Sequence, residues 1–122
     1  MPVRIKDYVK FEGTLSPGSL GTEYTVLEIT GEDEPYMVEG YIDLSALQSG
    51  DSVRIREYIS VDGANYRIYE EGDFNGPVDK PVLRFHTKTL LGSMKYKVTL
   101  TQTAGTLRSF PYKFIEERLE TV

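Results

Sequence analysis

The chain has 122 residues and a mass of 13.8 kDa, enough for one domain with a hydrophobic core but not for two. It has no cysteine and one histidine, His86, which excludes disulfide frameworks, thiolate metal sites, cysteine nucleophiles and sites built from several imidazoles. Fourteen basic and nineteen acidic side chains give a formal net charge of -5, which argues against a basic nucleic-acid binder. We therefore expect one domain spanning residues 1–122, with no nucleic acid as its partner.

Hydrophobic side chains recur at every second position along most of the chain, which is typical of strands with one buried face. The first such stretch places Val3, Ile5, Val9 and Phe11 on one side. In chain order, the expected strands cover residues 3–11, 22–30, 36–44, 53–61, 66–70, 82–90, 95–103 and 109–117. The pattern predicts an all-β, antiparallel sandwich of about eight strands, similar to a jelly roll.

The segments between these strands are read as turns and loops. Asp62-Gly63 predicts a hairpin with glycine at positive φ, residues 71–81 predict a long irregular loop, and residues 115–119 a possible final helical turn. The first twelve residues are charged at five positions, and no apolar run approaches about 18 residues. Neither a signal peptide nor a membrane span is therefore expected.

Charged residues are separated along the chain. Nine acids and no base lie between Phe11 and Val53, whereas seven bases and no acid lie between residues 80 and 115. The two blocks are either neighbours in the sheets, paired across strands, or opposite faces that favour head-to-tail contacts or docking on a charged scaffold. A third reading lets the basic block, with its aromatic rings, bind a nucleic acid. Only the opposite-face arrangement predicts assembly that weakens as salt rises.

No motif points to catalysis, since nucleophile elbows, phosphate loops, dinucleotide fingerprints and zinc-protease motifs are all missing. His86 reads as a solvated strand residue rather than a base. The carboxylates of residues 70–79 have the oxygen chemistry that Ca²⁺ prefers but lack EF-hand spacing, so a solvated acidic loop is favoured. We expect no enzyme, cofactor or metal. The candidate interface residues are Tyr8, Tyr41 and Tyr58, which alternation places opposite the apolar side chains of their strands.

The C-terminal segment KVTLTQTAGTLRSFPYKF, residues 97–114, is the most distinctive part of the chain. A strand of Val, Thr and Leu runs into a Gln-Thr-Ala-Gly-Thr turn, an arginine and an aromatic last strand; Gly105 is expected at positive φ. This segment resembles the ending of small structural proteins of tailed bacteriophages and related viruses, and residues 21–30 and 41–59 look like their early strands. The residues that carry the likeness are Val98, Leu100, Gln102, Thr103, Ala104, Gly105, Thr106, Arg108, Phe110, Pro111 and Tyr112. The chain departs from the pattern at Leu107, where Gly is frequent, and at Tyr112, where Trp is frequent.

The resemblance implies a component of a virion, assembled in the host cytoplasm, as a head decoration, minor capsid or connector-type protein. Its expected partners are the capsid, another virion protein or copies of itself in a homo-oligomer. The alternative is a small binding module that presents residues 71–81 to a carbohydrate or a cell surface.

Overall fold

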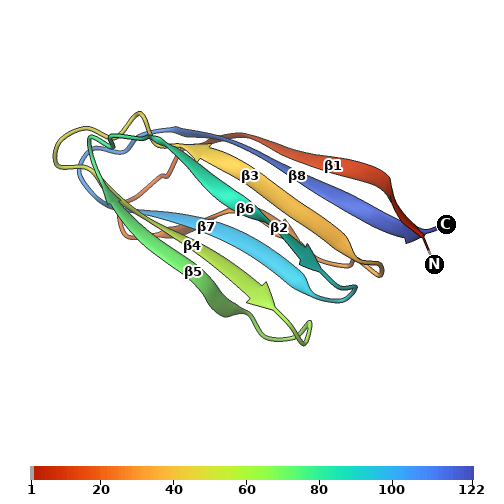
Figure 1. The fold of residues 1–122 in the computed structure, drawn as a ribbon. Coiled ribbons are helices and arrows are strands. Elements are labelled where there is room, and N and C mark those ends of the chain that lie inside the picture. The colour runs from red at the N-terminus through yellow and green to blue at the C-terminus, as the bar shows by residue number, and fades with distance from the viewer. Residues whose placement is uncertain (1) are drawn as a thin grey trace.

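The structure, a computed structural model, describes residues 2–122 as two four-stranded antiparallel sheets packed face to face (Figure 1). One sheet has the strand order β1-β8-β3-β6 and the other β2-β7-β4-β5. The predicted all-β sandwich of eight strands is confirmed. The strands are β1 (Val3–Leu15), β2 (Glu23–Ile29), β3 (Tyr36–Asp43), β4 (Ser52–Ser60), β5 (Arg67–Asn75), β6 (Val82–Leu90), β7 (Lys95–Ala104) and β8 (Phe110–Thr121).

Strand pairing follows the nested order of a jelly roll. The first strand pairs with the last, β2 with β7, β3 with β6, and β4 with β5. The pairs β3–β8 and β4–β7 then join these ribbons into the two sheets. Each strand from the first half of the chain therefore lies beside one from the second half.

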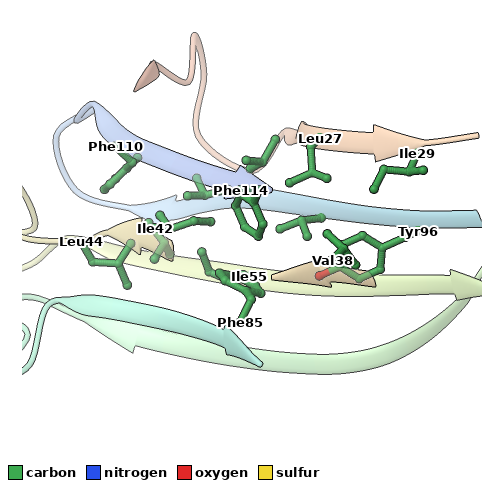
Figure 2. Packing of buried hydrophobic residues seen from close by; sticks show 14 of the residues in the cluster. Leu27, Ile29, Val38, Ile42, Leu44, Ile55, Phe85, Tyr96, Phe110 and Phe114 are labelled. Atoms are coloured by element: carbon green, nitrogen blue, oxygen red, sulfur yellow. The ribbon is translucent and has the colours of Figure 1, made fainter. Parts of the chain in front are cut away.

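The core fills the space between the two sheets, where alternate side chains of both meet (Figure 2). From β7 it takes Tyr96, Val98 and Leu100, and from β8 Phe110 and Phe114, all at most 4% exposed. The remaining buried hydrophobic residues are Val26, Leu27, Ile29, Tyr36, Val38, Ile42, Leu44, Leu47, Val53, Ile55, Phe85 and Leu90. The period-two pattern of the sequence thus corresponds to the inward faces of most strands. The expectation that Val3 and Ile5 share a buried face with Val9 and Phe11 is wrong, because an extra residue, Lys6, separates the two pairs and leaves Val3 and Ile5 62% and 48% exposed.

Each of the four edge strands carries one extra residue relative to its neighbour. The extra residues are Lys6 in β1, Val26 in β2 and Tyr69 in β5, and β6 bulges at the pair His86 and Thr87. A β-bulge bends the strand and changes which face the following side chains occupy. A further register shift lies between the central strands β4 and β7. The bulges matter below because they override simple alternation.

Two sequence expectations are wrong in detail. Residues 71–75 continue strand β5 rather than beginning a loop, because they pair with β4 as far as Asn75. Residues 115–119 form strand rather than a helical turn, because β8 has a partner on each side, β1 and β3, which satisfies its backbone groups in the sheet.

The two glycines expected in turns adopt positive φ. Gly63, in the β4–β5 hairpin, has a φ of 77°, and Gly105, between β7 and β8, has a φ of 90°. A side chain at Gly105 would also collide with Asp51. Both turn predictions are therefore confirmed.

Candidate functional site

Nested pairing brings the acidic and basic halves of the chain together. Glu28 of β2 lies opposite Lys97 of β7, and Arg108 contacts Asp51 at 2.7 Å. The Lys113 ammonium lies 3.9 Å from the Glu12 carboxylate, across β1 and β8. The blocks are therefore sheet neighbours, and the hypothesis of two oppositely charged faces is wrong.

The three candidate interface tyrosines do not form one patch. Tyr8 and Tyr41 are 59% and 47% exposed. Both lie on the outer face of the β1-β8-β3-β6 sheet, since Tyr8 is opposite Glu117 and Tyr41 opposite Lys113 on β8. Tyr58 lies on the outer face of the other sheet, so at most two of the three can share a flat contact surface.

Tyr58 belongs to a cluster within the chain. Its hydroxyl donates a hydrogen bond of 2.5 Å to Glu23, its ring packs edge-on against Tyr66 at 6.3 Å, and Lys97 lies 4.9 Å from the ring centre. Partial burial alone would raise the pKa of the Glu23 carboxyl, but hydrogen bonds from Thr99 and Tyr58 lower it overall. Tyr58 thus has a role in stabilising its own sheet, and contact with a partner stays a prediction for all three tyrosines.

One end of the sandwich is held by a buried carboxylate, Asp51, which is 2% exposed. It accepts hydrogen bonds from the backbone N–H groups of Gln48 and Thr106, at 2.9 Å each, and from Arg108 Nε at 2.7 Å. The Gln48 N–H is the largest cause of the lowered pKa of Asp51, with Arg108 and Thr106 adding to it. The carboxylate therefore fixes the β3–β4 connection to the β7–β8 turn.

Gln102 completes this corner. Its side-chain amide donates to the carbonyls of Ala104 and Thr106, and its amide oxygen accepts from the Arg108 N–H at 3.0 Å. The Gln-Thr-Ala-Gly-Thr-Leu-Arg motif thus builds the turn, and its polar side chains bond to the protein itself. The motif identifies a structural corner rather than a ligand site.

A second buried carboxylate, Glu116, lies on the inner side of β8 and is 1% exposed. Arg118 binds the neighbouring Glu32 at 2.9 Å and stands 3.8 Å from Glu116, whose Oε2 has no hydrogen-bond partner. Burial raises the pKa of Glu116 to about 8, and the neighbouring Glu32 carboxyl, through a shared hydrogen bond and its charge, adds to the shift. The raised pKa of Glu116 and the lowered pKa of Glu32 favour a proton on Glu116 and a charge on Glu32. Sequence reasoning missed this pair, because Glu116 interrupts the apolar face of β8 without any motif.

A groove of about 400 Å³ opens between the free edges of β5 and β6. On its floor lies an ion pair: Lys88 Nζ is 3.0 Å from Glu57 Oε1, and the two side chains are only 11% and 10% exposed. Glu57 also accepts a 2.5 Å hydrogen bond from the buried hydroxyl of Tyr96. Burial, followed by the Glu57 charge, raises the pKa of Tyr96, so this hydroxyl remains a donor.

Lys88 is the residue that alternation misplaced. Counting by twos from the buried Phe85 puts His86 and Lys88 on the same outward side, but the bulge at residues 86–87 turns Lys88 inward. His86 stays exposed, on the wall of the groove, and its backbone carbonyl accepts a 2.6 Å hydrogen bond from Lys88. The expectation that His86 is a solvated strand residue is therefore confirmed, but not its grouping with Lys88.

The acidic segment proposed as a candidate calcium loop contributes to ion pairs. Asp73 binds Arg54 at 2.8 Å, and Glu71 binds Arg56 at 3.2 Å, across β4 and β5. Within residues 2–122, no group of three or more acidic or histidine side chains is placed to hold a metal ion. In the same residues no helix is long and apolar enough to cross a membrane.

No protein family model matches the chain, and no curated protein matches its sequence. Solved structures match its fold. A subunit of the Bacillus endospore appendages, disulfide-linked pili, is 13% identical with a TM-score of 0.53, and the match covers 91% of this chain and 88% of the other.

Viral proteins are also among the structural neighbours. A protein of infectious bursal disease virus, Gx strain, is 12% identical with a TM-score of 0.50; the match covers 96% of this chain but only 32% of the viral one, so this chain spans about a third of its length. VP17, a capsid protein of bacteriophage P23-77, is 6% identical with a TM-score of 0.43, and the match covers 99% and 100% of the two chains. At these identities the likenesses to the pilus subunit and to the infectious bursal disease virus protein establish the fold only.

Proposed function

We propose that this chain is a non-enzymatic structural protein of a virion, a head decoration or minor capsid component that binds the capsid lattice or its own copies. The observation that supports this proposal is the jelly-roll likeness to a pilus subunit, which covers about nine-tenths of both chains. The likeness to a protein of a virus supports it further. Together with the resemblance of residues 97–114 to phage structural proteins, these neighbours favour assembly over catalysis.

The mode of assembly must differ from that of the pilus. This chain has no cysteine, so its copies cannot be joined by disulfides. The bulges in β1, β2, β5 and β6 disturb every free sheet edge, which disfavours strand-to-strand joining. We therefore assign the contacts to a sheet face, and the outer face that carries Tyr8 and Tyr41 is the candidate.

Light scattering coupled to size exclusion tests this assignment. The full chain should form species larger than a monomer, or should bind capsids that lack it, and Tyr8→Ser combined with Tyr41→Ser should abolish both. The matched control is Val61→Ser combined with Leu107→Ser, which changes two residues that are 75% and 41% exposed in turns. A strict monomer at about 1 mM and low salt, with no affinity for capsids, would contradict the proposal.

A further inference from the structure

The groove between β5 and β6 is a feature that assembly through a sheet face does not use. We propose that it is a binding site for a neutral saccharide, held by the Glu57–Lys88 pair and by the ring of Tyr69. This is a further function beyond the proposed structural one, and it can fail without affecting assembly.

The walls of the groove are shaped by two bulges. Tyr69 is the extra residue of β5, and His86 and Thr87 form the bulge of β6; all three line the groove. The β6 bulge turns Lys88 into the groove floor. Bulges commonly re-aim side chains beside binding sites, and here two of them, on different sheets, face one cavity.

The floor of the groove carries a nearly buried ion pair, Glu57 and Lys88. Burying an ion pair costs several kcal/mol per charge before the two attract each other, and an apolar pair of similar volume is often as stable. The surrounding side chains Ile55, Leu83 and Phe85 would suit such an apolar pair. A buried charged pair that borders a cleft is therefore better explained by a ligand.

The chemistry of the lining fits hydroxyl groups. A sugar hydroxyl donates one hydrogen bond and accepts others, and the floor offers the Glu57 carboxylate as an acceptor beside the Lys88 ammonium as a donor. Tyr69 lines the same groove and is 54% exposed, with Lys88 Nζ 5.9 Å from the centre of its ring. The exposed part of the ring offers an aromatic surface for the apolar C–H face of a sugar.

The charge of the groove lining and the shape of its strand edges disfavour other classes of ligand. The lining includes the acids Glu57, Glu70 and Glu71 against the bases Arg84 and Lys88, so a phosphate or sulfate would meet more acids than bases. An added peptide strand would need a regular edge, which the bulges in β5 and β6 remove. A neutral polyhydroxylated ligand meets both constraints.

The test uses the full chain on an array of neutral and acidic glycans, followed by solution titration with neutral hexaoses of glucose, xylose, mannose and galactose. We expect binding of at least one neutral glycan, with amide shifts in the NMR spectrum at Tyr69, Gly72 and His86. Tyr69→Ala should weaken that binding by roughly tenfold or more. Ile68→Ala, which removes a similarly exposed side chain of the same strand that does not line the groove, should leave it unchanged.

Three results would overturn the inference. They are no neutral binding up to about 10 mM, binding restricted to sialylated or sulfated glycans, and neutral binding that survives in Tyr69→Ala. Capture of an extended peptide in the groove instead would also contradict it. Each variant is checked by light scattering, so loss of saccharide binding with unchanged assembly separates this inference from the proposed function.

Discussion

The two ends of the sandwich each bury a carboxyl group, and the two groups behave oppositely. Asp51 accepts three hydrogen bonds from donors of the β3–β4 connection and the β7–β8 segment, and its pKa is lowered. Glu116 is buried to the same degree but has an oxygen without a donor, and its pKa is raised to about 8. Burial alone therefore does not decide whether a carboxyl is ionised; hydrogen-bond donors and neighbouring charges decide it as well.

The difference assigns the two ends different roles. The Asp51 corner joins segments that are 55 residues apart in sequence through one fully bonded anion. The Glu116 end places an acid with a raised pKa beside Glu32 and Arg118, and the charge of Glu116 responds to pH. The Asp51 end is held by an ionised carboxylate, whereas the stability of the Glu116 end depends on the protonation of Glu116.

The largest expected effect on stability comes from removing the Asp51 carboxylate. Asp51→Ala leaves two buried N–H groups and the Arg108 guanidinium without their acceptor, and we expect it to lower Tm by roughly 15 °C. Asp73→Ala removes an exposed ion pair with Arg54, and should lower Tm by no more than about 3 °C. Scanning calorimetry of both variants measures the lowering of Tm in each. Equal lowering would show that Asp51 contributes no more to stability than an exposed ion pair does.

A smaller effect on stability is expected from the protonation of Glu116, at the other end of the sandwich. The folded chain holds a proton on Glu116 up to a pKa of about 8, whereas the unfolded chain loses it near 4.5. The contribution of Glu116 to stability should therefore fall as pH rises from 4.5 to 8, by at most about 1.4 kcal/mol for each pH unit. Glu32, whose pKa is lowered, acts below this window.

Urea denaturation across this pH range checks the sign. Glu116→Gln keeps a neutral hydrogen-bonding side chain, so its unfolding free energy should vary less with pH than that of the wild type. Glu117→Gln, on the outer face of the same strand, should keep the wild-type profile. A wild-type stability that rises between pH 5 and pH 8 would contradict the assignment.

The smallest effect is expected at the groove. Glu57→Gln combined with Lys88→Met removes both charges while preserving an acceptor for Tyr96, and should change the unfolding free energy by less than about 1 kcal/mol. Urea denaturation at pH 7 measures it. A loss above about 3 kcal/mol would show that the pair, like Asp51, is structural.

Much of the fold follows from local pattern. Period-two hydrophobicity located all eight strands, and the turn glycines Gly63 and Gly105 were placed by the need for positive φ. Strand ends were less predictable: residues 71–75 and 115–119 join their sheets because partner strands are available, a tertiary effect that local sequence does not encode.

The candidate site was less predictable than the fold. The three tyrosines do lie on outer faces of the sheets, yet nested topology sends Tyr8 and Tyr41 to one sheet and Tyr58 to the other. The groove depends on two bulges. The single extra residue that forms a bulge cannot be recognised from the sequence composition. Nothing in the sequence around Lys88 indicated that its ammonium is buried.

The four edge bulges bear on how such a molecule behaves when crowded. A β protein held at high density is exposed to ribbon-like growth, in which each unpaired edge templates the next copy without limit. Here Lys6, Val26, Tyr69 and the 86–87 pair interrupt every edge that could serve as a template. Growth by strand addition at the sheet edges is therefore disfavoured, whichever other surfaces the molecule uses for contact.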